Sequence, residues 1–192
     1  MIDLSNIKNY TSHQPAGWSL IGNEAAFNQL PETHKAQVLF LDKTAKDYIY
    51  SFTNPAANLT SGDLWDPFAK GNFRSVEKLY VNRSSEEGKQ ALKKWLFSRG
   101  IAFSTWVYVL PNSGEQPMMM TWKMLIKFSA GLFIHDDIMV FDNSLNWCLF
   151  FFHENELFFG KDQQYDPSEN DKMMKALNER KKNFPRFRHP YL

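Results

Sequence analysis

The chain of 192 residues contains a single cysteine, Cys148, and therefore cannot close an internal disulfide. A chain without disulfides fits a reducing compartment. Cys148 lies within the apolar run from Trp147 to Phe152. We therefore expect a small buried hydrophobe rather than a nucleophile, which would need partial exposure and a neighbouring base.

Glycine is also sparse, and the nine glycines are scattered along the chain. No G-x-G-x-x-G spacing occurs, which removes a common sequence signature of phosphate binding. The Cys/His spacing typical of zinc and the G-x-S-x-G motif of serine hydrolases are missing as well. From these absences we expect no catalytic residue, no cofactor and no metal.

Long apolar runs and an excess of one charge are absent. No run approaches the roughly 18 apolar residues typical of a membrane-spanning helix. The N-terminus lacks the basic and apolar regions of a secretory signal. The formal net charge is only +1, so overall charge does not favour nucleic acid as a partner. These features predict a cytoplasmic protein without a membrane partner.

Aromatic residues are abundant, at 16% of the chain within a hydrophobic fraction of 43%. This content is enough for a substantial core, and the length predicts a single α+β domain over residues 1–192. We expect residues 1–23 to form an extended N-terminal arm and residues 183–192 a C-terminal tail. Helical spacing of apolar residues predicts a helix over 32–52. Residues 118–131 suit a helix, with a strand as the competing prediction.

The clearest local unit is the order strand, helix, strand between residues 76 and 110. Val76 to Val81 and residues 103–110 have the composition of strands, and the serines and acids at 84–87 open the helix between them. Such a unit is long enough for a right-handed crossover that joins a parallel pair. We therefore predict a mixed central sheet, followed by a terminal helix that begins near Pro167.

Residues 135–160 contain three apolar runs separated by polar breaks, a pattern typical of an antiparallel meander with Asx and Ser turns. The runs cover residues 138–141, 147–152 and 157–159. We expect the aromatic side chains in its interior to hold the sheet together, in particular Trp147, Phe151 and Phe159.

Charge is distributed unevenly in the last third of the chain. From Leu132 to Asp171 nine acids stand against Lys161, a net charge of −8, whereas residues 172–192 carry +6. Both regions could be ordinary solvated surfaces, or the basic tail could fold back on the acids. The sharper hypothesis is an acidic surface that attracts a basic partner. Its predicted contact residues are Asp136, Asp137, Asp142, Glu154 and Glu156.

Three other hypotheses use the same third of the chain. Asp136 and Asp137 suggest a cation site, but adjacent residues on a strand point to opposite faces. His153 and Glu154 suggest the acid/base pair of a small hydrolase-like enzyme, although polar residues between apolar runs are also typical of a hairpin loop. Residues 180–192 are basic, and from residue 183 onward they alternate aromatic and cationic side chains, which suits an accessory protein for single-stranded nucleic acid.

The region from residue 120 to 160 has a distinctive order of features. A tryptophan-containing segment precedes an aspartate pair and a predicted strand. Trp147 then begins a second strand, which is followed by His153-Glu154. The third apolar run ends in an aromatic residue and a glycine, Phe159-Gly160. This order resembles bacterial polymorphic-toxin immunity proteins of the contact-dependent or type VI kind. The resemblance implies a cytoplasmic α+β protein that has no catalysis of its own and blocks one cognate toxin, often a nuclease. The basic tail departs from a uniformly acidic binder.

Overall fold

The computed structural model describes residues 2–15, 27–53, 59, 67–68, 71–82, 84–111, 115–134, 136–164, 175–176 and 178–185. The strands are β1 (Thr11–Ser12), β2 (Val38–Leu41), β3 (Phe73–Tyr80), β4 (Trp106–Pro111), β5 (Met118–Thr121), β6 (Ile138–Phe141), β7 (Trp147–Phe152) and β8 (Glu156–Gln163). They are accompanied by η1 (Ile7–Asn9), α2 (Glu32–Lys35), α3 (Lys43–Thr53), α4 (Glu86–Phe97) and α5 (Trp122–Leu132).

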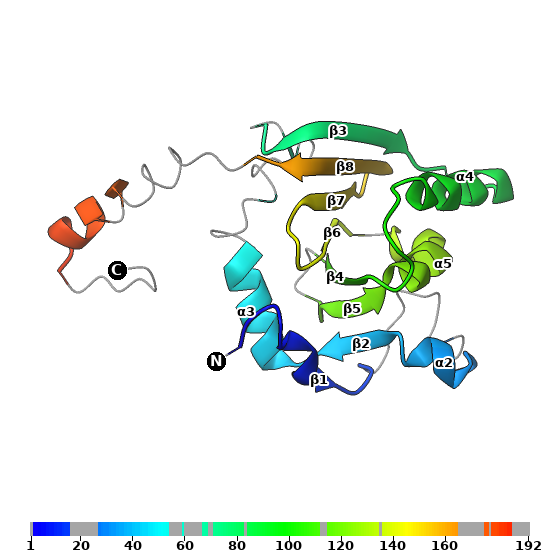
Figure 1. Ribbon diagram of the computed structural model, residues 1–192, viewed down its shortest axis with the longest axis horizontal. Helices are drawn as coiled ribbons and strands as arrows, with labels where there is room; N and C mark the ends of the chain where they lie inside the picture. Colours follow the sequence, from blue (N-terminus) through cyan, green and yellow to red (C-terminus); the bar gives the residue numbers. More distant parts are fainter. Residues whose placement is uncertain are drawn as a thin grey trace.

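All eight strands belong to one sheet with the order β1-β2-β5-β4-β6-β7-β8-β3 (Figure 1). Every neighbouring pair in that order is antiparallel. The predicted α+β class is confirmed. The predicted meander is confirmed too, because β6 pairs with β7 and β7 pairs with β8.

The predicted parallel pair within residues 76–110 is not formed. β3, α4 and β4 follow one another along the chain, but β3 pairs with β8, whereas β4 pairs with β5 and β6. The meander therefore separates the two strands, and β3 becomes the outermost strand beside β8 (Figure 1). A local pattern of strand, helix and strand cannot reveal this, because the neighbour of β3 lies about 80 residues further along the chain.

The predicted helix over 32–52 is wrong in its centre, where β2 interrupts it. Val38 to Leu41 is a continuous apolar run, and such a run fits a buried strand as well as one helical face. Its pairing with β5 decides in favour of the strand. Asp42 then caps the next helix, because its Oδ1 accepts a hydrogen bond from the Ala45 N–H at 2.9 Å.

Both competing predictions for residues 118–131 hold, each for a part of the segment. Met118 to Thr121 forms β5 between β2 and β4, and all four residues are buried. The side chain of Thr121 then accepts a hydrogen bond from the Met124 N–H, which starts α5.

The two faces of the sheet carry separate cores. α4 and α5 cover one face, where Trp147, Phe151 and Phe159 are 6%, 0% and 3% exposed. η1 and α3 cover the other face, with Ile7 and Ile49 fully buried. Alternate residues of β7 enter opposite cores, so Cys148 points away from Trp147. Cys148 is fully buried, and that burial raises the pKa of its thiol.

The N-terminal arm is more structured than predicted, since it contributes η1 and a strand that pairs with β2. Its residues 16–23 lie outside the described residues, as do Pro167 at the start of the predicted last helix and the tail residues 186–192. Residues 178–183 are helical and exposed. Among the helices of the described ranges, none is both long and apolar enough to cross a membrane.

Candidate functional site

The five acids predicted to bind a partner do not form one continuous surface. Asp137 precedes β6 and Asp142 follows it, so about 16 Å of strand separates them, at about 3.3 Å per residue. Glu154 and Glu156 lie in or beside the turn between β7 and β8, at the same end of the sheet as Asp137. Asp142 therefore stands alone at the opposite end.

Asp142 organises the turn between β6 and β7. Its carboxylate accepts hydrogen bonds from the Ser144 N–H at 2.9 Å and from the Trp147 Nε1–H at 3.0 Å. An aspartate that binds the backbone two residues ahead is typical of an Asx turn. Both oxygens are thus occupied within the chain, and the role of Asp142 in this structure is to shape the turn.

Asp137 is buried, with only 5% of its surface exposed. Its Oδ1 lies 2.9 Å from both the backbone nitrogen and the Nδ1 of His153. This hydrogen bond raises the pKa of His153, burial opposes it, and the charges of Asp137, Glu154 and Asp136 add to the increase. The pair fastens the β7–β8 turn to the start of β6, so Asp137 is not an open contact residue.

The remaining acids are more accessible. Glu156 forms an ion pair with Lys78 at 2.7 Å, and its side chain is 26% exposed. Glu154 is 72% exposed, and its Oε1 lies 3.8 Å from the Nε2 of His153. Asp136 is partly exposed, and its charge helps to raise the pKa of Tyr50 to about 12, an effect caused mainly by burial of that phenol. Glu154 is therefore the acid best placed to meet a partner.

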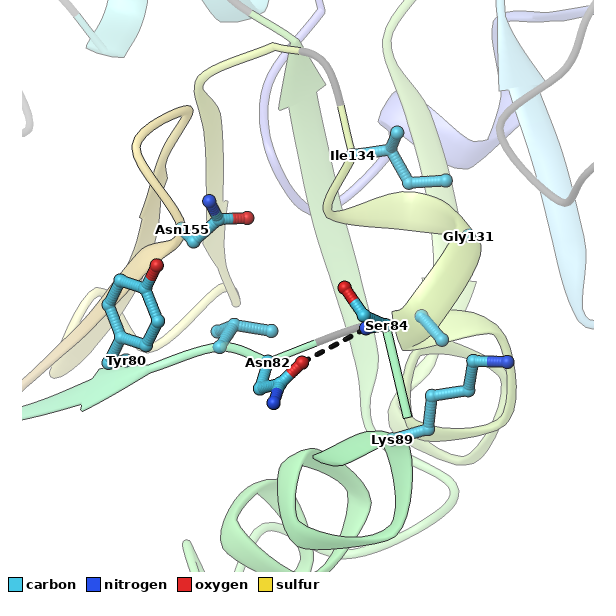
Figure 2. Close-up of a pocket in the computed structure, with 9 residues that line it drawn as sticks. Tyr80, Asn82, Ser84, Lys89, Gly131, Ile134 and Asn155 are labelled. Carbon is cyan, nitrogen blue, oxygen red and sulfur yellow. Dashed lines mark hydrogen bonds between the residues drawn. The ribbon is translucent and has the colours of Figure 1, made fainter. Parts of the chain in front are cut away.

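A groove of about 840 Å³ opens beside this end of the sheet (Figure 2). It lies between the end of β3, the first turn of α4, the end of α5 and the β7–β8 turn. Its lining mixes apolar and polar groups, a composition suited to peptide or protein contacts. The lining residues are Tyr80, Val81, Asn82, Ser84, Lys89, Ala130, Gly131, Ile134 and Asn155.

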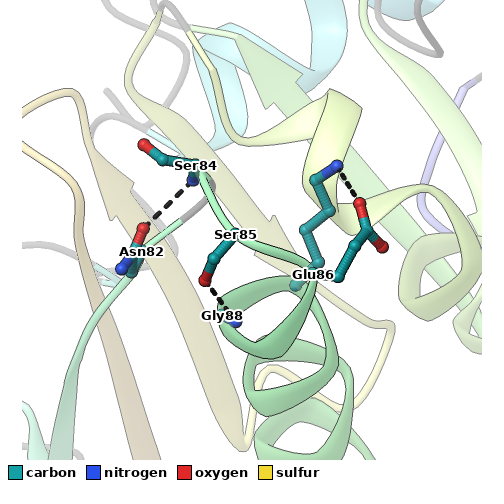
Figure 3. A network of polar contacts seen from close by, with 6 residues as sticks. Asn82, Ser84, Ser85, Glu86 and Gly88 are labelled. Atoms are coloured by element: carbon teal, nitrogen blue, oxygen red, sulfur yellow. Dashed lines mark hydrogen bonds and ion pairs between the residues drawn. The ribbon is translucent and has the colours of Figure 1, made fainter.

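The corner between β3 and α4 fixes one wall of the groove (Figure 3). The Ser84 N–H donates to Asn82 Oδ1 at 3.0 Å, and the Gly88 N–H donates to Ser85 Oγ at 3.1 Å. A Cβ on Gly88 would lie 1.8 Å from the Asn82 carbonyl oxygen. Only glycine therefore allows α4 to start this close to the preceding loop.

The sequence did not point to this groove. Tyr80 and Asn82 belonged to the predicted strand and its exit, and Asn155 to a predicted turn. The serines at 84 and 85 signalled the start of a helix but gave no information about what faces it. The groove depends on the end of α5, which the antiparallel sheet brings close to α4.

The hydrolase-like hypothesis required a pocket that converges on His153 and Glu154. The groove is lined by the adjacent Asn155 but by neither of these two residues. No group of three or more potential metal ligands occurs in the described part of the chain. Comparison of the chain with protein-family models, with curated proteins and with solved structures gave no match.

Proposed function

We propose that this chain is a non-catalytic immunity-type protein that binds and neutralises one cognate bacterial toxin, and that the toxin docks at the groove and the adjoining β7–β8 turn. The proposal joins the sequence resemblance to the position of two exposed side chains at this end of the sheet, Tyr80 and Glu154. A toxin with a basic face, as on many nucleases, would complement Glu154.

The exposure of Tyr80 is the observation that supports this location of the docking site. Tyr80 is 68% exposed at the rim of the groove, and its register partner Glu156 places it beside the turn that bears Glu154. An exposed tyrosine next to a depression is the kind of residue that dominates protein–protein interfaces when a partner buries it. The neighbouring acid adds charge selectivity, because a wrongly charged partner would be repelled.

The five predicted contact acids divide into two groups under this proposal. Glu154, Asp136 and Glu156 lie at the docking end, where Glu154 is 72% exposed and Glu156 is paired with Lys78. Asp137 and Asp142 act indirectly, the first by holding His153 and the turn, and the second by shaping the β6–β7 turn. Replacing either of the latter would affect the fold before it affected binding.

Growth protection provides the test. We expect the gene next to this one to encode a secreted toxin, and co-expression of this chain with the toxin domain to restore growth of the host cell. The double variant Tyr80→Ala with Glu154→Lys should lose protection. The matched control is Asp47→Lys, because Asp47 is a similarly exposed acid, at 62%, on α3. Equal protection by the double variant and the control would contradict the proposed site.

A further inference from the structure

We propose that the outer edge of β3 is a strand-docking site, at which an extended segment of the partner protein adds a ninth strand to the sheet. The inference rests on the proposed function for its choice of a protein partner. β3 is the last strand in the sheet order, and no other strand of the described residues pairs with its outer edge (Figure 1). Exposed edges of this length readily accept another strand.

The backbone of β3 presents regularly spaced bonding groups at this edge. The Val81 N–H donates to the Asn155 carbonyl at 2.7 Å, which continues the β3–β8 pairing one residue past Tyr80 and Glu156 and shows that the N–H of Val81 faces β8. Hydrogen-bonded and non-hydrogen-bonded pairs alternate along an antiparallel ladder. The N–H and C=O groups of Val76, Lys78 and Tyr80 therefore point away from β8 and toward an incoming strand.

The charged side chains of β3 do not shield that edge. Lys78 turns back across β8, where its Nζ lies 2.7 Å from Glu156 and 4.9 Å from the ring centre of Phe158. Glu77 turns back on the opposite face and pairs with Arg99 at 2.7 Å. Charges normally protect edge strands when they project past the edge, whereas here they are held over the sheet.

A second copy of this chain does not suit the site. Two β3 strands that pair about a two-fold axis would place Glu77 opposite Glu77 in one central register. The next central register places Arg74 opposite Lys78. Directly opposed like charges destabilise a strand pair, so charge disfavours both homodimers and favours a segment of different sequence.

The exposed side chains define the chemistry of that segment. Val76 and Tyr80 are 47% and 68% exposed, and they are separated along β3 by Lys78. A complementary strand would carry apolar β-branched residues opposite Val76 and Tyr80 and a polar residue opposite Lys78, whose ammonium group is paired with Glu156. Tyr80 is the last residue of β3 and also lines the groove, so the edge of β3 ends at the rim of the groove.

Amide hydrogen exchange of the full chain tests the inference with the synthetic peptide Thr-Val-Thr-Glu-Thr-Val-Thr. Saturating peptide should slow exchange of the outward amides of Val76, Lys78 and Tyr80 by about tenfold or more. The inward amides of Glu77 and Leu79 should change little. The same peptide N-methylated at every amide, which has no N–H left to donate to β3, should have no effect.

Unchanged exchange at the three outward amides, or equal protection by the N-methylated peptide, would overturn the inference. The variant Val76→Pro removes one outward N–H while leaving the ladder to β8 intact, and it should abolish the protection at Lys78. The two proposals can fail separately. Peptide pairing without toxin neutralisation would reject the proposed function, and neutralisation without peptide pairing would reject the edge site.

Discussion

At the scale of single residues, the acidic side chains have two different roles: some stabilise the fold and others face solvent. Asp137 and Asp142 are occupied by hydrogen bonds within the fold, whereas Glu154 projects into solvent. Sequence alone could not separate them, because all three follow or precede an apolar run and look alike in a charge count. Only the partner of each carboxylate, such as the His153 backbone nitrogen that donates to buried Asp137, distinguishes an acid that builds the fold from an acid that can bind.

The Asp137–His153 pair makes stability depend on pH. The pKa of His153 is raised in the folded state, so protonated His153 stabilises the fold fully below its unfolded pKa, near 6.5. That contribution is lost as the pH rises through the higher folded pKa. We expect the free energy of unfolding of the wild type to exceed that of His153→Gln by more at pH 5.5 than at pH 8.5.

Urea denaturation of both proteins across this pH range measures the difference. The variant Glu154→Gln serves as a control, because it removes a weaker and more distant charge at 3.8 Å from the imidazole. A difference between wild type and His153→Gln that stays constant with pH would show that His153 contributes no charge interaction.

At the scale of elements, sequence prediction succeeded where local chemistry was sufficient. The meander was predicted because three apolar runs are bounded by turn residues, and its strands pair in that order. The helix over 32–52 failed because Val38 to Leu41 suits either structure until β5 lies beside it. The wall of the groove could not be predicted from the sequence either, because no local sequence pattern indicates that Gly88 contacts Asn82.

Gly88 therefore offers a direct test of the β3–α4 corner. The variant Gly88→Ala should destabilise the protein by about 3 kcal/mol, because its Cβ would overlap the Asn82 carbonyl at 1.8 Å and backbone must move. Ala91→Gly on the exposed face of α4 is a control, with an expected loss of about 1 kcal/mol from helix propensity alone. Thermal or urea unfolding of both variants gives the comparison, and a Gly88→Ala protein as stable as the wild type would reject this corner geometry.

At the scale of the whole molecule, the topology gathers residues that are distant in sequence. β3 does not pair with the strands nearest to it in the sequence. It pairs with β8 instead, and this pairing brings Tyr80 beside the turn that carries Glu154. The α+β class followed from composition and pattern, but this juxtaposition did not, because non-local strand pairing has no local signal. The candidate site is consequently a product of strand order, and most of its residues could not be selected from the sequence.

A toxin partner that binds at the groove end of the sheet should be detected by titration calorimetry of this chain with the purified toxin domain. We predict a complex whose affinity falls as salt increases and drops at least about tenfold in the Tyr80→Ala, Glu154→Lys double variant. The Asp47→Lys control should bind like the wild type. Absence of a complex, or equal affinity of the double variant and the control, would contradict toxin binding at this site.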